Sequence, residues 1–448
     1  DWARIRGGFN RATRAPNIGE LFLNPQEVFT GGGNFGDACS VRSNAPFGAG
    51  GTGPDNVLNP NEPPVALASG QTQAGATSAR LICEELMGGA GSIAANQYYN
   101  VADSTVQGGG GGFAWVLQEG NSTLQSETAD TWTLGAVIRS PWENEWLSGL
   151  NFTLDYYNVE ITDAIMLQSI DQAVFSCYGA VQVSTAAEAK AQAQSAACQL
   201  VPRDSNNGAA LNTSISYGNQ ATIKTAGFDV GVNWIGELEE LVGLPGRLGL
   251  SMNATVLDTY ETKQSAAAFD VLTEWKGSLG PNLSGTNGGA YDYRLFGSMT
   301  YFKDDWSVSL RWRHLPEVWS ANYAAQAGVI ANNARVSAGD AGIILGYTPN
   351  TEIQTDSYNI FDLAANWNVN ETFTLRAGIT NLFDEEPANS GSSAGRPPGT
   401  DLSAASQCGG APGCRAAGGY SLPSRGGFNG GYYDTLGRRM FLGVKANF

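Results

Sequence analysis

Strict alternation of apolar and polar residues is the feature of this sequence that most restricts its fold. Between positions 306 and 313 every second residue is apolar, and the residues between them are serine or arginine. Because successive side chains of a β-strand point to opposite faces, this period predicts a strand with one apolar face. Ten segments show it, namely residues 3–9, 132–138, 152–156, 228–234, 248–256, 295–301, 306–312, 361–369, 373–379 and 440–448.

The connections between these segments alternate in length. Long connections span residues 17–125, 166–222, 263–290, 319–355 and 384–432, and short ones span 140–149, 237–247, 303–305 and 369–371. Transmembrane β-barrels have short periplasmic turns and long extracellular loops, whereas nothing in a soluble β-sandwich makes every second link long. The sequence therefore predicts an all-β chain forming a transmembrane antiparallel β-barrel, whose last strand runs inward so that Phe448 ends in the periplasm.

Composition excludes several other classes of protein. A net charge of −17 argues against a nucleic-acid partner, and no stretch reaches the 18 consecutive apolar residues of a membrane helix. There is no Walker loop, no G-x-S-x-G motif and only one histidine, so neither an enzyme activity nor a cofactor is expected. We interpret His314 as a residue at the outer end of a strand. The 58 glycines suggest that the long connections are irregular loops.

The six cysteines test this topology, because all of them lie in long connections and two fall in each of three connections. This distribution suggests the bridges Cys39–Cys83, Cys177–Cys198 and Cys408–Cys414, although six cysteines permit fifteen pairings. Disulfides persist at the cell surface and in the periplasm, so their placement supports extracellular loops. A metal site is less favoured, because no C-x-x-C pair accompanies the single histidine.

Four motifs resemble those of TonB-dependent outer-membrane receptors. In the family's order they are FNRATRAPNIGELF (9–22), GNSTLQSETADTWTLG (120–135), TNLFD (380–384) and the closing strand GRRMFLGVKANF (437–448). The resemblance implies a barrel of 22 strands filled by an N-terminal plug. Residues 1–448 would then be the C-terminal portion, with about ten strands, and we expect a fragment because an open sheet edge in lipid leaves backbone groups unpaired. The implied partners are outer-membrane lipid and the TonB energy-transducing complex, which would act through the missing plug.

Candidate site residues follow from strand parity and from the resemblance. Gly443, Ala446 and Phe448 resemble the C-terminal signal that the barrel-assembly machinery reads. Tryptophans of the apolar faces should meet lipid, and basic residues of the polar faces should meet either an anionic ligand or, as we favour, acids of the plug and wall. These lumen-facing residues are Arg311, Arg313, Arg376, Arg439 and Lys445. Candidates for ligand contact in the long loops are Trp115, Trp319, Tyr323, Tyr347, Tyr432 and Tyr433.

These observations favour energy-dependent uptake of a scarce solute across the outer membrane of a Gram-negative bacterium. The solute would be a small molecule such as a siderophore-type iron chelate, or an oligosaccharide, captured by the extracellular loops. The alternative is a passive outer-membrane channel or a surface adhesin scaffold. A plug domain with an energy-coupling box in the upstream sequence would distinguish them.

Overall fold

A computed structural model describes the chain over most of its length. The described residues are 2–31, 37–40, 43, 45–49, 67, 70–100, 113–144, 146–267, 269–280, 282–283, 286–287, 289–319, 321–340, 342–345, 354–387 and 433–446.

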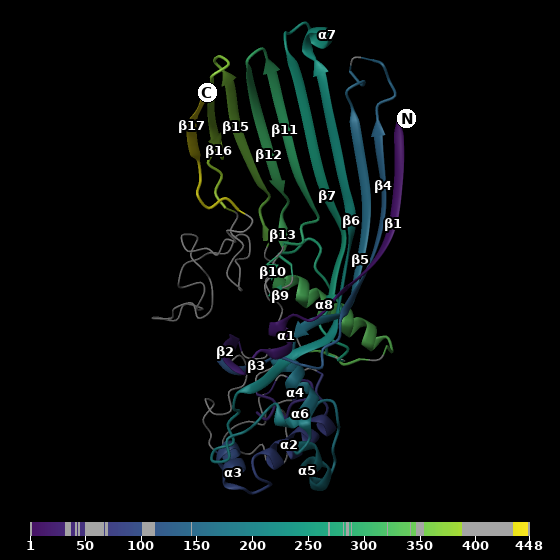
Figure 1. Cartoon of the computed structure of the whole chain (residues 1–448). Helices are drawn as coiled ribbons and strands as arrows, with labels where there is room; N and C mark the ends of the chain where they lie inside the picture. Colours follow the sequence, from purple (N-terminus) through teal and green to yellow (C-terminus); the bar gives the residue numbers. More distant parts are fainter. Residues whose placement is uncertain are drawn as a thin grey trace, which may run out of the picture.

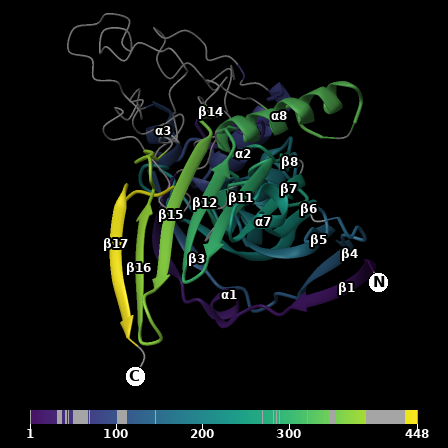
Figure 2. The same cartoon turned by 90° about the horizontal axis from the view of Figure 1, so that it is seen from above.

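Ten long strands form one curved antiparallel sheet (Figures 1 and 2). In spatial order they are β1 (Ala3–Arg14), β4 (Glu127–Arg139), β5 (Asn151–Leu167), β6 (Thr213–Glu237), β7 (Arg247–Lys263), β11 (Tyr293–Lys303), β12 (Trp306–Leu315), β15 (Tyr358–Asn368), β16 (Phe373–Thr380) and β17 (Arg439–Ala446). Each strand pairs with the next of the ten along the chain. The ten predicted segments are confirmed, and the sheet is open, with β1 and β17 at its edges.

The register of the sheet aligns the alternating residues into one apolar face. Trp306 faces Trp367 across the β12–β15 pair, and Leu363 faces Ile379 across the next pair. Three to five apolar or glycine positions follow one another on each strand, about 17–30 Å of strand length. We call this surface the apolar band. Its larger members include Phe9, Trp132, Leu134, Leu154, Val232, Trp234, Leu250, Met252, Met299, Leu310, Trp312, Phe361, Leu363, Trp367, Leu375, Leu442 and Val444.

Charged residues end the apolar band on the same face. Arg11 pairs with Asp130 at 2.6 Å, and Lys224 pairs with Glu160 at 3.0 Å. Asp130 lies opposite Glu160 in the β4–β5 register, so the four side chains form one row across the strands. Beyond this row β5 and β6 continue, and β6 runs for 25 residues. β5 and β6 are therefore much longer than their apolar segments, which is why sequence alternation underestimated them.

Short turns join the strands at one end of the sheet, the upper end in Figure 1, which we call the turn end. Asp304 and Asp305 alone link β11 to β12, and Asp304 adopts a left-handed backbone conformation with φ 47°. The β6–β7 connection contains a short helix, α7 (Leu238–Val242), which ends at the left-handed Gly243. The prediction of short polar turns is confirmed at these positions.

Helices fill much of the long connections at the opposite end (Figure 1). They are α1 (Ile18–Phe22), α2 (Gln73–Leu86), α3 (Ile93–Asn100), α4 (Ile170–Tyr178), α5 (Ala186–Ala193), α6 (Ala196–Gln199) and α8 (Ala321–Ser337), accompanied by the short strands β2 (Gln26–Gly31), β3 (Phe113–Glu119), β8 (Thr273–Glu274), β9 (Asn282–Leu283), β10 (Thr286–Asn287), β13 (Val318–Trp319) and β14 (Gln354–Thr355). The expectation of irregular loops is therefore wrong for these segments. Side-chain caps at Thr72, Ser169, Thr185 and Ser195 begin four of the helices. None of the described helices is long and apolar enough to span a membrane.

Candidate functional site

Two long connections fold together into a compact unit that we call the loop cap. It consists of α2 to α6 with β2 and β3, and it lies beyond the end of the sheet opposite the short turns (Figure 1). One face of α2 is buried through Ala76, Ala79, Ile82 and Cys83, at helical spacing. The cap holds most of the main buried cluster, whose large members include Phe47, Ile82, Met87, Tyr98, Tyr178 and Val201. Most of the largest core of the described chain thus lies outside the ten-strand sheet, with Ile215 of β6 packed into it.

Two disulfides close the loop cap from within. Cys39 is bonded to Cys83 of α2, and Cys177 of α4 is bonded to Cys198 of α6. All four cysteines are fully buried. These are the first two of the three pairings suggested by the sequence, whereas Cys408 and Cys414 lie outside the described residues. Each bridge ties two helices or segments of one connection, so the cap is covalently braced.

A buried ion pair joins the two connections of the loop cap. Both terminal nitrogens of Arg203 donate to the carboxylate of Asp37, and Arg203 also donates to the carbonyl of Gly208 at 2.9 Å. The Tyr98 hydroxyl donates to Asp37 at 2.7 Å, and the Arg203 guanidinium lies 5.3 Å from the centre of the Tyr98 ring. The side chain of Arg203 is only 3% exposed. The two charges therefore depend on each other for compensation.

This environment shifts the pKa values of the groups around it. Burial by itself raises the pKa of Asp37, but the charge of Arg203 and the hydrogen bonds from Arg203, Tyr98 and the Cys39 amide outweigh it, so the net pKa is lowered. Burial raises the pKa of Tyr178, which lies beside the same pair. Asp37 is consequently ionised and Tyr178 neutral at physiological pH.

The polar face of the sheet carries a second charged cluster, on β1, β4 and β5. Arg6 on β1 reaches over β4 to Asp155 on β5, with nitrogen to oxygen distances of 2.7 Å. Gly135 lies between them in the register, and a Cβ atom there would stand 1.9 Å from the Asp155 carboxylate. Glycine at this position therefore permits the ion pair. Asp229 on β6 faces Asp155 and accepts a hydrogen bond from Thr255 at 2.8 Å.

Comparison with protein-family models matches residues 78–382 to the TonB dependent receptor-like, beta-barrel family. The matched residues make up more than half of the 448-residue chain. The chain belongs to this family. The family resemblance noted in the sequence is thereby confirmed, and the matched residues contain the eight long strands from β4 to β16.

Several solved structures align with parts of this chain at low sequence identity. The chain is similar to the ferric enterobactin receptor PfeA from Pseudomonas aeruginosa, with 13% identity and a TM-score of 0.45, over 100% of this chain and 38% of PfeA. It is also similar to the siderophore receptor PirA from Acinetobacter baumannii, with 12% identity and a TM-score of 0.33, over 61% of this chain and 30% of PirA. The copper transporter OprC gives 15% identity and a TM-score of 0.30, over 59% and 27%. This chain thus spans well under half the length of these receptors. A search of curated proteins found no match.

In this receptor barrel the five basic residues predicted to face the lumen all lie on the polar face. They come from β12, β16 and β17, and β15 lies between β12 and β16. Arg313 pairs with Asp362 of β15 at 3.2 Å, and Arg439 pairs with Asp434 at 2.9 Å. Within the described part of the chain, Arg311, Arg376 and Lys445 form no ion pair. Acidic residues of this chain therefore pair with two of the five, Asp362 from β15 and Asp434 from the connection before β17.

The aromatic residues proposed for ligand contact lie in different environments in the receptor barrel. Trp319 of β13 stacks on Tyr323 of α8, with ring centres 4.5 Å apart, and both rings are partly exposed. Tyr433 is buried, packs edge-on against Tyr358 at 4.9 Å and hydrogen-bonds to Tyr291. Trp115 belongs to β3, but its side chain lies outside the described set, as do Tyr347 and Tyr432 entirely. Trp319 and Tyr323 therefore form the accessible aromatic pair among the residues that can be placed.

Three other residues singled out in the sequence, Gly443, Ala446 and His314, lie within strands. Gly443 and Ala446 belong to β17, opposite Arg376 and Phe373 of β16, while Phe448 is beyond the described residues. His314 lies at the cap-side end of β12, within 2.9 Å of the Asn359 amide oxygen and 3.4 Å of the Tyr293 hydroxyl. Among the described residues, no three His, Cys, Asp or Glu side chains are grouped as a metal site.

Sequence reasoning missed the Arg203–Asp37 pair and the helices of the loop cap. The capping pattern was visible, since Ser169 precedes Gln172 and Thr185 precedes Glu188 by three residues, and both form capping boxes. No local signal could have joined Arg203 to Asp37, because 166 residues separate them.

Proposed function

We propose that this chain forms part of the wall and the surface cap of an outer-membrane receptor that takes up a scarce solute with energy supplied through TonB. The polar face of the strands lines the path, and the loop cap lies on the extracellular side. Residues of the missing portion would supply the plug through which TonB acts. The solute is a small molecule such as an iron chelate, or an oligosaccharide.

One observation carries this proposal. Two long connections fold into a disulfide-braced loop cap at one end of a sheet that bears an apolar band. A passive pore needs no buried core in its loops, whereas capture of a dilute ligand benefits from a rigid surface because less ordering entropy is lost on binding. Arg311, Arg376 and Lys445 add positive charge to the path, which suits an anionic solute such as a ferric chelate.

Growth and uptake measurements test the proposal. A strain lacking the receptor should lose growth on the transported iron or carbon source, and the full-length receptor should restore it. Deletion of the energising complex should abolish uptake in the restored strain. Uptake that persists without this complex would favour the passive channel, and a deletion strain that changes only its attachment to surfaces would favour the adhesin scaffold.

Cysteine labelling tests the orientation separately. Lys190 of α5 is exposed in the loop cap, and Asp305 is exposed in the β11–β12 turn. A membrane-impermeant maleimide added to intact cells should modify Lys190→Cys and spare Asp305→Cys, which becomes reactive only after lysis. The reverse pattern would place the cap in the periplasm.

A further inference from the structure

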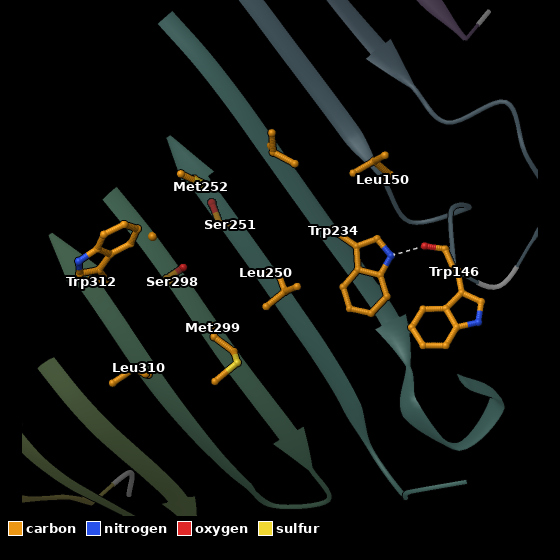
Figure 3. A pocket seen from close by; sticks show the side chains of 12 residues that line it. Trp146, Leu150, Trp234, Leu250, Ser251, Met252, Ser298, Met299, Leu310 and Trp312 are labelled. Atoms are coloured by element: carbon orange, nitrogen blue, oxygen red, sulfur yellow. Dashed lines mark hydrogen bonds between the residues drawn. The ribbon is translucent and has the colours of Figure 1, made fainter. Parts of the chain in front are cut away.

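A groove of about 660 Å³ crosses the apolar band towards its turn end (Figure 3). Two neighbouring register rows on β7, β11 and β12 form its walls. One row is Met252, Gly297 and Trp312, and the other is Leu250, Met299 and Leu310. No charged side chain lines it. The groove therefore suits a flexible hydrocarbon better than a polar ligand.

Gly297 creates the hollow. It stands between two large side chains, Met252 and Trp312, in the register. A Cβ atom at Gly297 would meet only the Trp312 side chain, at 3.4 Å from the ring, which is ordinary contact. The site thus has room for additional atoms, and a larger side chain there would fill the groove without clashing with the backbone.

One end of the groove reaches the short turns, where tryptophans and exposed carboxylates follow the apolar side chains. Trp234 of β6 donates a hydrogen bond from Nε1 to the carbonyl of Trp146, at 2.6 Å, so the β4–β5 turn is fixed beside β6 (Figure 3). Tryptophans are characteristic of the membrane interface, where one part of the ring is apolar and the other is wet. The adjoining turns expose Glu143 in one and Glu239 and Glu240 in the other. These three carboxylates form no salt bridge within the described residues.

We propose that the groove holds an acyl chain of a phospholipid whose head group carries an amine. Because this chain belongs to an outer-membrane barrel family, lipid is the solvent of the apolar band, and the groove offers one chain more contact than the surrounding surface. The carboxylates beside Trp146 would attract the ammonium group and disfavour a head group of net negative charge. The head-group assignment rests on the proposed orientation, which places the turns beside the periplasmic leaflet.

Photocrosslinking tests this site. The full-length receptor, purified from outer membranes, is reconstituted in vesicles of phosphatidylglycerol that contain traces of phosphatidylethanolamine with a diazirine on one acyl chain. We expect crosslinks to concentrate on the β7, β11 and β12 segments of the groove. Gly297→Leu should reduce them about tenfold, the factor that corresponds to losing the burial of about two methylene groups. Ala365→Leu, on the same face of β15 but outside the groove, should leave them unchanged.

Head-group selectivity is measured with the same diazirine on phosphatidylglycerol. The amine lipid should label the groove several-fold more strongly, and Glu239→Gln with Glu240→Gln should remove the difference. Circular dichroism melting of each variant confirms that it is folded. Labelling spread evenly over the apolar band and insensitive to Gly297→Leu would overturn the site. Equal groove labelling by both lipids in the unaltered receptor would overturn the assignment of an amine head group. The test of orientation by cysteine labelling does not depend on either result.

Discussion

The loop cap buries its large apolar residues, whereas the wall of ten strands exposes them. Ile82 and Tyr98 of the cap are fully buried, while Trp132 is 58% exposed and Leu442 is 78% exposed. The cap therefore gains stability from an internal core in water, as a soluble domain does. The wall has no such core on its apolar face and depends on lipid to cover it, so its stability comes from the hydrogen-bonded ladder in a bilayer.

This difference separates the kinds of substitution that each region tolerates. In the cap a lost contact leaves a cavity or an uncompensated charge. In the wall the cost of a substitution depends on the face of the strand, because one face meets lipid and the other does not. Each of the following substitutions is expected to destabilise one of the two regions and to leave the other unchanged.

The largest effect is expected from Arg203→Met. It leaves the Asp37 carboxylate buried without its cation, which should destabilise the cap by about 3–5 kcal/mol. The cap should become sensitive to protease on intact cells, while the strands stay resistant. The double variant Asp37→Leu with Arg203→Met removes both charges and should recover most of the resistance. A single variant as resistant as the unaltered receptor would show that the pair is dispensable.

The same ion pair predicts acid sensitivity of the cap. The pKa of Asp37 in the folded cap is lowered. Its contribution to the stability of the cap is therefore present above the ordinary aspartate pKa, near 3.9, and is lost as pH falls through the folded pKa. The pKa of Tyr178 is raised, so its contribution is present below pH 10 and is lost as pH rises through its folded pKa. Cap unfolding followed by limited proteolysis against pH should show both limits. Asp37→Asn should weaken the acid dependence, and an unchanged profile would contradict this assignment.

Removal of one bridge should act on the cap alone. Cys177→Ser with Cys198→Ser opens a loop of 21 residues, worth about 3 kcal/mol in the chain-entropy model. Hydrogen exchange should increase in α4 and α6, and the exchange of β12 and β15 should not change. Faster exchange throughout the sheet would mean that cap and wall unfold as one unit.

A charge introduced into the wall should reveal which face meets lipid. Leu363→Arg puts a cation in the middle of the apolar band on β15 and should destabilise the barrel in a bilayer by about 2–4 kcal/mol. Ala364→Arg, one residue along on the polar face, should cost close to nothing. Denaturant titration of receptor folded into vesicles measures both variants. Equal costs would refute the assignment of the faces.

The wall could be predicted from the sequence far better than the cap, for a physical reason. A strand facing lipid on one side must alternate along its whole apolar span, so the sequence of a segment such as 306–312 predicts both the strand and the face that meets lipid. In the cap, Arg203 meets Asp37 only because two separate connections fold together, and no local pattern encodes that contact. The cysteine pairs were suggested by their shared connections, and this held for both Cys39–Cys83 and Cys177–Cys198. The accessible pair Trp319 and Tyr323 and the buried Tyr433 looked alike in sequence, since burial depends on the neighbouring strands.

The smallest effect is expected at an exposed helix start in the cap. The Thr185 hydroxyl accepts from the Glu188 amide at 3.3 Å, and the Glu188 carboxylate accepts from the amides of Ser184 and Thr185. The hydrogen bonds from Ser184, followed by those from Thr185, lower the pKa of Glu188. Thr185→Ala should cost about 1 kcal/mol of local stability, as loss of an N-cap does. Hydrogen exchange of α5 measures it, with Lys190→Ala on the same helix as the control.

Because its folded pKa is lowered, Glu188 supports this helix start above the ordinary glutamate pKa, near 4.3, and ceases to do so as pH falls through the folded value. Exchange at α5 should therefore rise in acid in the unaltered receptor, and Glu188→Gln should flatten that rise. If exchange of α4 rose equally with Thr185→Ala, the cap would unfold as a single cooperative body. A response confined to α5 would instead show that the cap, unlike the continuous ladder of the wall, opens one helix at a time.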